Sequence, residues 1–92
     1  MIKIVGNNIW RGGEKIGWLQ DDNVYSHENR KIGYFSDNDI YNQEGRKVGY
    51  IEGDYIKTVD GKEIRLEDNR EHVVGGSISD LARAAIRLLL GD

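Results

Sequence analysis

Residues 23–38 read NVYSHENRKIGYFSDN, and this sixteen-residue pattern decides the fold because the chain repeats it. The pattern recurs as DIYNQEGRKVGYIEGD (39–54) and YIKTVDGKEIRLEDNR (55–70). A shorter copy, NIWRGGEKIGWLQDD (8–22), precedes these blocks and lacks one residue before its turn. Most of the chain is therefore one hairpin-sized unit used four times.

One position of the unit is held only by glycine or asparagine, namely Gly13, Asn29, Gly45 and Gly61. These residue types tolerate a positive φ angle, which most side chains avoid. A cation follows this position in three of the four copies. The pattern fits a three-residue loop in which a type I turn is closed by a left-handed bulge. Each unit is therefore predicted to be a β-hairpin.

β-Branched and aromatic residues fill both arms of each unit, which is typical of strands. The first arms contain Ile9-Trp10, Val24-Tyr25, Ile40-Tyr41 and Ile56-Lys57, and the second arms span residues 16–19, 32–35, 48–51 and 64–67. Short links rich in Asp and Asn join the units. The sequence predicts a mainly β fold: four hairpins over residues 7–70, arranged as an antiparallel meander that closes into a ring or shallow barrel. An N-terminal strand over residues 1–6 and the segment 72–75 are expected to pair with the ends of this sheet.

The C-terminal part of the chain, SISDLARAAIRLLLGD (77–92), is typical of a helix. Ser77 and Asp80 have the spacing of a capping box, and Gly91 is a stop signal. We expect a helix over residues 77–90 that is apolar nearly all round, apart from a narrow stripe of Asp80, Arg83 and Arg87. Such a helix is normally buried on all sides. A helix on one face of an open sheet is the alternative. Its length of about 20 Å is too short for a membrane span.

The composition fits one domain over residues 1–92. The chain has 38% hydrophobic residues, no cysteine and a net charge of −3. Stability must therefore come from the core, from closure of the sheet or from self-association. The first residues lack the features of a signal peptide, so a cytoplasmic location is the default expectation.

Tandem hairpins followed by a short apolar helix resemble the small bacterial proteins called four-fold β-flower proteins. The resemblance rests on Ile9-Trp10, Tyr25, Tyr41, the Gly or Asn turn position, and the triplets at 16–18, 32–34 and 48–50. It implies hairpins arranged as petals around a hydrophobic helix, an architecture reminiscent of the tubby-like C-terminal barrels. No settled activity comes with the family. The fourth hairpin departs from the pattern at Lys57, Arg65 and Glu67.

Glycine recurs inside the second arms at Gly17, Gly33 and Gly49, where it costs stability unless another backbone comes close. We interpret these glycines as clearance for the central helix. They would then face inward with Leu19, Phe35 and Ile51, while Trp18, Tyr34 and Tyr50 lie on the other face with Ile16, Ile32 and Val48. The opposite assignment is nearly as defensible, because both faces are partly apolar.

Six aromatic residues recur in the repeat and either pack between hairpins or make a ligand-binding face: Trp10, Trp18, Tyr25, Tyr34, Tyr41 and Tyr50. Packing is favoured. Choline- and carbohydrate-binding modules also use rings from neighbouring hairpins, but the likeness is weak here.

The charges form a second pattern, because all hairpin turns of a meander lie at one end. That end would carry a cationic rim of Lys15, Arg30, Lys31, Arg46, Lys47 and Lys62. The connecting end would carry an acidic rim of Asp21, Asp22, Asp37, Asp39, Glu52, Asp54, Glu67 and Asp68. Polar turn residues that favour solubility explain both rims. A site for anionic headgroups at the cationic rim is the functional alternative, since tubby-like barrels bind phosphoinositide headgroups.

Other classes of function find little support in the sequence. His27 and His72 have no nucleophile in a recognised motif, so no enzyme activity is predicted and no catalytic residue is assigned. No cofactor is expected, and the acidic turns lack the spacing of a metal site. An acidic chain without a continuous basic face disfavours nucleic acid.

Three functional hypotheses remain. The first is a non-enzymatic protein-interaction or self-assembly module, for example a homo-oligomer. The second is a binder of anionic lipid headgroups at the cationic rim. The third is a carrier of a small apolar ligand beside the central helix.

Overall fold

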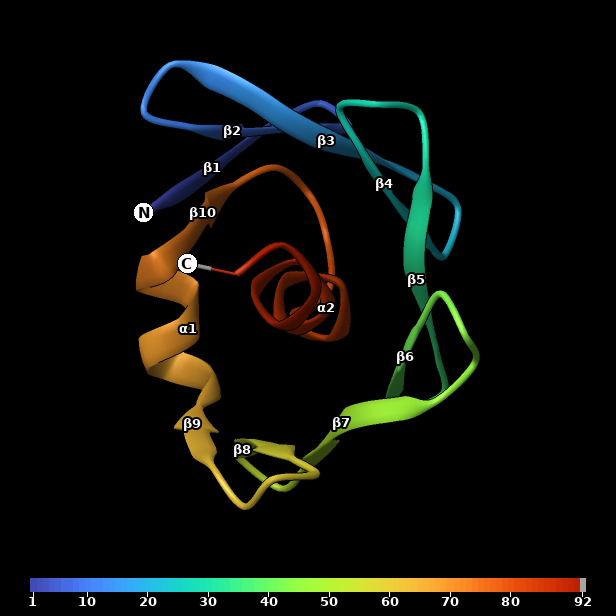
Figure 1. Ribbon diagram of the computed structural model, residues 1–92. Coiled ribbons are helices and arrows are strands. Elements are labelled where there is room, and N and C mark those ends of the chain that lie inside the picture. Colours follow the sequence, from blue (N-terminus) through green and yellow to red (C-terminus); the bar gives the residue numbers. More distant parts are fainter. Residues whose placement is uncertain (92) are drawn as a thin grey trace.

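The computed structural model describes residues 1–91, in which ten strands form a single sheet (Figure 1). The strands are β1 (Ile2–Val5), β2 (Asn8–Arg11), β3 (Glu14–Gln20), β4 (Asn23–Ser26), β5 (Lys31–Ser36), β6 (Asp39–Asn42), β7 (Lys47–Glu52), β8 (Tyr55–Thr58), β9 (Glu63–Arg65) and β10 (Val73–Gly75). The helices are α1 (Leu66–His72) and α2 (Asp80–Leu90). The prediction of a mainly β fold is confirmed.

Strands that follow one another in sequence pair antiparallel from β1 to β9, and β10 adds to β1 in parallel. The units at 8–20, 23–36, 39–52 and 55–65 are each an antiparallel pair of strands. Ser26 and Arg30 close one connecting loop through their backbones, and Asn29 within it has a φ of 66°. The first unit differs, because Arg11 pairs with Glu14 and only two glycines lie between them.

The sheet does not close into a barrel, so the prediction of closure is wrong. β9 and β10 are its two end strands, and α1 lies between them and contacts both (Figure 1). The second arm predicted over residues 64–67 remains a strand only to Arg65. The acidic residues Glu67 and Asp68 lie in the first turn of α1, and basic residues lie in its last turn. This order of charges stabilises a helix through its dipole, so the chain continues as α1 where the earlier repeats continue as a strand.

The helix α2 lies inside the curve of the sheet, where it contacts β4 to β7, β10 and α1 (Figure 1). Its buried residues are small or branched: Ala82, Ala84, Ala85 and Ile86. They pack in one cluster with buried strand residues that include Ile9, Val24, Ile40 and Ile56. Removal of this apolar area from water is the main source of stability for a chain without cysteines.

The helix begins three residues later than the sequence predicts. Ser79 caps its N-terminus, and the Ser79 hydroxyl accepts a hydrogen bond from the Ala82 amide at 3.1 Å. The expected cap at Ser77 is therefore wrong, because the chain is still extended at Ser79, with φ −73° and ψ 164°. Gly91 ends the helix, as predicted.

The polar stripe of α2 faces α1 and β10. Asp80 accepts two hydrogen bonds from Arg70 of α1, at 2.9 and 2.7 Å. Arg83 donates to the Val73 carbonyl at 2.8 Å, and Arg87 donates to the buried side chain of Asn69 at 3.2 Å. The polar stripe therefore attaches α1 and β10 to α2, and α1 lies between the two end strands of the sheet.

The inward orientation of the strand glycines is confirmed, since Gly17, Gly33 and Gly49 are all buried. A β-carbon at Gly33 would meet the Tyr41 backbone carbonyl oxygen first and Leu89 of α2 at 2.6 Å, and one at Gly49 would lie 2.5 Å from Leu88 and 3.0 Å from the Lys57 backbone carbonyl oxygen. These two glycines give the helix clearance. At Gly17 the three nearest atoms all belong to the backbone of Tyr25 and Ser26, so this glycine makes room for the neighbouring strand and not for α2.

Neither helix within residues 1–91 has the length and the apolar character that crossing a membrane requires.

Candidate functional site

Three β-bulges decide which side chains reach the outer face of the sheet. In β3, Ile9 pairs with Gly17 and Trp10 pairs with Lys15, so that Ile16 is passed over. The same shift passes over Ile32 in β5 and Val48 in β7. A bulge changes the alternation of side chains along a strand.

The bulges turn the passed-over residues inward and the preceding lysines outward. Ile16, Ile32 and Val48 pack against the core cluster. The prediction that they share a face with Trp18, Tyr34 and Tyr50 is therefore wrong. The lysines share the aromatic face instead: Lys15 lies over Trp18, Lys31 over Tyr34 and Lys47 over Tyr50.

Each of these lysines lies across the face of a ring. The distances from the lysine Nζ atom to the ring centroid are 5.4, 4.8 and 4.7 Å for Lys15, Lys31 and Lys47. Such geometry is attractive because the ring face carries partial negative charge.

Rings on neighbouring hairpins also stack on one another. Trp18 of β3 and Tyr25 of β4 are 5.4 Å apart with an interplanar angle of 8°. Tyr34 of β5 and Tyr41 of β6 are 4.9 Å apart with an angle of 18°. Both pairs join one repeat unit to the next, so the prediction that the aromatic residues pack between hairpins describes these four rings.

Together the rings and lysines make a band across the sheet, which we call the outer row. It runs in strand order through Lys3, Trp10, Lys15, Trp18, Tyr25, Lys31, Tyr34, Tyr41, Lys47, Tyr50 and Lys57. All six of its rings are half-buried. The outer row can therefore offer ring surface and ammonium groups to another molecule at the same time.

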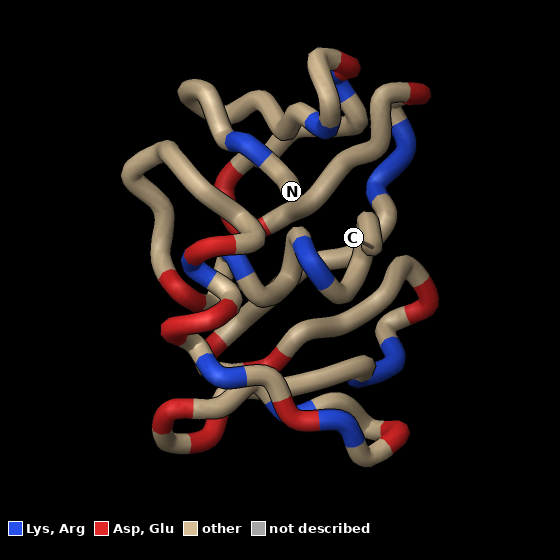
Figure 2. The backbone as a smooth tube through the Cα atoms, turned by 90° about the vertical axis from the view of Figure 1, so that its left-hand side faces the viewer, with Lys and Arg blue, Asp and Glu red and all other residues tan. Residues whose placement is uncertain are grey.

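The structure divides the predicted cationic rim into two groups. Lys15, Lys31 and Lys47 belong to the outer row, whereas Arg30, Arg46 and Lys62 stay exposed in the turns. Figure 2 shows that the blue segments of the hairpin turns each lie next to a red one. The six cations therefore do not form one continuous basic patch.

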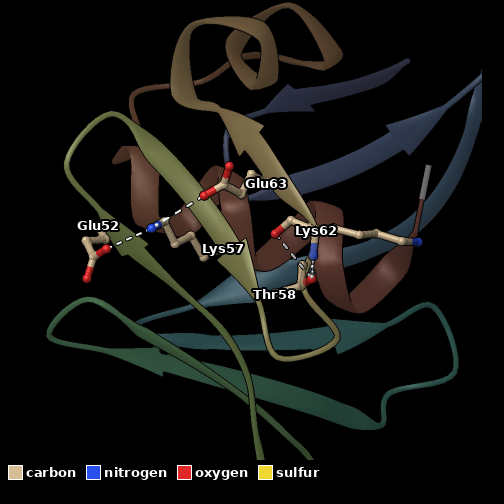
Figure 3. A network of polar contacts seen from close by, with 5 residues as sticks. All are labelled: Glu52, Lys57, Thr58, Lys62 and Glu63. Carbon is tan, nitrogen blue, oxygen red and sulfur yellow. Dashed lines mark hydrogen bonds and ion pairs between the residues drawn. The ribbon is translucent and has the colours of Figure 1, made fainter.

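Carboxylates neutralise the lysines at the C-terminal end of the outer row. Lys47 lies 2.9 Å from Asp39, and the hydrogen bond with Asp39 raises the pKa of Lys47. Lys57 lies between Glu52 at 2.8 Å and Glu63 at 3.4 Å (Figure 3). The hydrogen bond with Glu52 raises the pKa of Lys57 and lowers that of Glu52.

Sequence reasoning did not foresee this ion-pair network. The sequence marks Lys57 only as a departure from the aromatic residue of the earlier repeats, and it places Asp39 and Glu52 in a separate acidic rim. The strand register would have indicated the network, since Lys57 pairs with Tyr50 on one side and with Glu63 on the other.

The histidine and carboxylate residues lie outside the outer row or at its edge. His27 is exposed in a hairpin turn. Within residues 1–91, no three His, Cys, Asp or Glu side chains lie close enough together to hold a metal ion.

A groove of about 720 Å³ opens beside Leu88 of α2 and is lined by Val48, Ile64, Lys62 and Glu63 among others.

Comparison with known proteins gives a family but no activity. A sequence model described as 4-fold beta flower protein matches residues 10–79. No curated protein and no solved structure matches the chain. The match covers both the hairpins and the segment that leads into α2, and so it includes most of the fold described above. The chain belongs to the 4-fold beta flower protein family.

Proposed function

We propose that this chain is a non-enzymatic protein-interaction or self-assembly module that uses the outer row as its contact surface. One observation carries the proposal: the outer row presents half-buried rings at regular spacing on the side of the sheet opposite to the core. Aromatic residues are enriched at the centres of protein interfaces because they bury a large area for little loss of conformational entropy.

The composition of the row supports the same proposal. Each ring pair is already stacked, so the surface is ordered before a partner arrives. Preorganisation lowers the entropic cost of association. The lysines that lie over the rings keep the surface soluble and leave their ammonium groups available for a carboxylate on the partner.

Sedimentation equilibrium over a micromolar to millimolar concentration range tests self-assembly. We expect the average mass of the wild-type protein to rise above that of the monomer with increasing concentration. The variant Tyr34→Ser/Tyr41→Ser removes one stacked pair and should shift this rise to higher concentration. A matched control, Gln43→Ser/Val59→Ser, changes two exposed turn residues and should behave as the wild type. A monomer mass for the wild type at every concentration would contradict self-assembly.

A second candidate function is binding of anionic headgroups at the turns. It is favoured by Arg30, Arg46 and Lys62, whose side chains form no ion pair within residues 1–91. Sedimentation with vesicles that contain anionic lipid should then fall with added salt and with Arg30→Glu/Arg46→Glu. Lys31→Glu/Lys47→Glu tests the lysines of the outer row separately. Equal sedimentation of all variants would contradict this candidate.

The carrier hypothesis has one structural feature in its favour, the groove beside Leu88. Its apolar floor is bordered by both cations and carboxylates. We rank it below the outer row because the leucines of α2 already pack against the buried strand glycines.

A further inference from the structure

The outer row contains one ring without a ring or cation partner. Trp18 and Tyr25 stack on each other, as do Tyr34 and Tyr41, and Tyr50 lies under Lys47. Trp10 has neither a stacked ring nor an overlying cation within residues 1–91. The strand register explains this difference. The neighbour of Trp10 on the preceding strand is Lys3, whereas Tyr25 and Tyr41 have a ring at that position. The lysine that pairs with Trp10, Lys15, lies over Trp18.

A groove of about 770 Å³ lies beside this ring. Its lining consists of Met1, Lys3, Val5, Trp10, Arg11, Gly12 and Gly13. The volume is in the range of pockets that hold small molecules, and such pockets combine apolar walls with a few polar groups. The groove thus has room for a molecule against the indole.

The shortened first repeat explains why the groove is open. Gly12 and Gly13 form a two-residue turn with φ angles of 56° and 83°. A β-carbon at either position would meet no atom within 4 Å. The later repeats have an acidic residue at the position of Gly12: Glu28, Glu44 or Asp60. The first repeat therefore lacks both the bulk and the negative charge that the other turns carry.

The charges around the groove favour an anion. Lys3 and Arg11 line it, and no carboxylate of residues 1–91 does. The Arg11 guanidinium is held in place because it donates to the Leu90 and Gly91 carbonyls. Glu14 follows the turn but does not line the groove. At the far end of the sheet, by contrast, Asp60 and Glu63 line the groove beside Leu88.

We propose that this groove binds a small planar aromatic carboxylate, whose ring stacks on the indole of Trp10 and whose carboxylate lies beside the Lys3 ammonium group. The rest of the outer row shows the geometry of such a contact, since Tyr25 stacks on Trp18 at 5.4 Å with Lys15 at the same ring. The ligand would complete the first unit of the row in the same manner.

Titration of the protein with 2-naphthoate, followed by calorimetry and by the two indole N–H signals in NMR spectra, tests the proposal. We expect saturable binding that moves the Trp10 signal and leaves the Trp18 signal in place. Trp10→Leu should weaken binding about tenfold, because it removes the stacking surface. Lys3→Glu should weaken it several-fold, and it changes an exposed side chain that the fold does not need.

Two controls make the result specific. Lys62→Glu reverses a charge at the far end of the sheet and should leave the affinity for 2-naphthoate unchanged. Cyclohexanecarboxylate carries the same charge without an aromatic ring and should bind much more weakly. The proposal is overturned by an absence of binding, by equal affinities of the two carboxylates, or by wild-type affinity in Lys3→Glu. Tyr34→Ser/Tyr41→Ser should retain 2-naphthoate binding, which separates this site from the contact surface proposed above.

Discussion

At the scale of single residues, the strand glycines make room for two different neighbours, the backbone of the adjacent strand and the leucines of α2. The β-carbon of an alanine at Gly17 would lie 2.1 Å from a backbone carbonyl oxygen of β4, which cannot move without disturbing the pairing. At Gly49 it would meet a methyl group of Leu88 at 2.5 Å, and this side chain can rotate, whereas the Lys57 backbone carbonyl oxygen lies farther away, at 3.0 Å. We therefore expect Gly17→Ala to cost about 3 kcal/mol or more in the free energy of unfolding, and Gly49→Ala about 1–2 kcal/mol.

Urea unfolding of the two variants measures these costs. Truncation of Leu88 to alanine should relieve most of the cost of Gly49→Ala in the double variant, and none of the cost of Gly17→Ala. If Leu88→Ala fails to relieve Gly49→Ala, then clearance for α2 is not the reason for this glycine.

The sequence predicts that these glycines are buried, but it cannot separate their two purposes. Repetition shows that a small residue is needed at Gly17, Gly33 and Gly49 alike. Which atom approaches each glycine depends on where α2 lies along the sheet, and the helix residues Leu88 and Leu89 reach only the second and third units. The position of Trp10 beside an open groove likewise depends on how β1, β2 and β3 pair, and residue types alone do not predict that pairing.

At the scale of secondary-structure elements, α1 is held to α2 by a buried polar contact. The Asn69 side chain is 1% exposed and accepts a hydrogen bond from Arg87 at 3.2 Å. Asn69→Ala should lower the free energy of unfolding by about 2 kcal/mol, because the hydrogen bond from the half-buried Arg87 guanidinium to the buried amide oxygen is lost.

The double variant Asn69→Leu/Arg87→Met provides the control. Replacement of both partners by apolar residues leaves no unsatisfied group, so the double variant should be more stable than the two single changes predict by addition. Additive effects in urea unfolding would show that the Asn69–Arg87 contact is not a coupled pair.

The ion pair between α1 and α2 makes stability depend on pH. The hydrogen bond from Arg70 lowers the pKa of Asp80 below its ordinary value of 3.8. A carboxyl group with a lowered pKa in the folded state binds fewer protons there than in the unfolded chain. Its contribution to stability is therefore full above pH 3.8 and is lost as the pH falls through the lower, folded-state pKa.

Thermal or urea unfolding between pH 2 and pH 6 detects this effect. Asp80→Asn should be less stable than the wild type near neutral pH, by up to about 1 kcal/mol as for other exposed ion pairs. The difference should shrink as the pH falls below the ordinary pKa. Arg70→Gln should give the same flattened profile. Parallel pH profiles for all three proteins would show that the pair does not couple to stability.

The two elements that the sequence did not predict, α1 and the bulges, have separate physical causes. The fourth repeat contains the hairpin turn signal at Gly61, so the pattern continues locally, but its second arm forms only the three-residue strand β9 before α1 begins. The bulges leave no composition signal, because both Ile16 and Lys15 suit a strand in either orientation. Only pairing with the neighbouring strand shows that Ile16 turns inward and Lys15 outward.

At the scale of the whole molecule, the curved sheet separates two apolar surfaces. The inner one is closed by α2 and its alanines, whereas the outer one is the half-exposed row of rings and lysines. Residue types alone predict the hairpins and the inner glycines from the repeat, and the apolar helix from the segment that follows it. The open edge of the sheet and the order of lysines over rings follow from contacts between units, and they are visible only in three dimensions.

The most direct test of the outer row as a contact surface is a dilution series followed by NMR signals of assigned residues. If the account holds, the ring signals of Trp18, Tyr34 and Tyr41 shift with protein concentration, while the amide signals of the exposed turn residues Gln43 and Val59 stay constant. Concentration-dependent shifts confined to α1 and the two end strands, or no shifts anywhere, would contradict the assignment of the outer row as the surface of self-assembly.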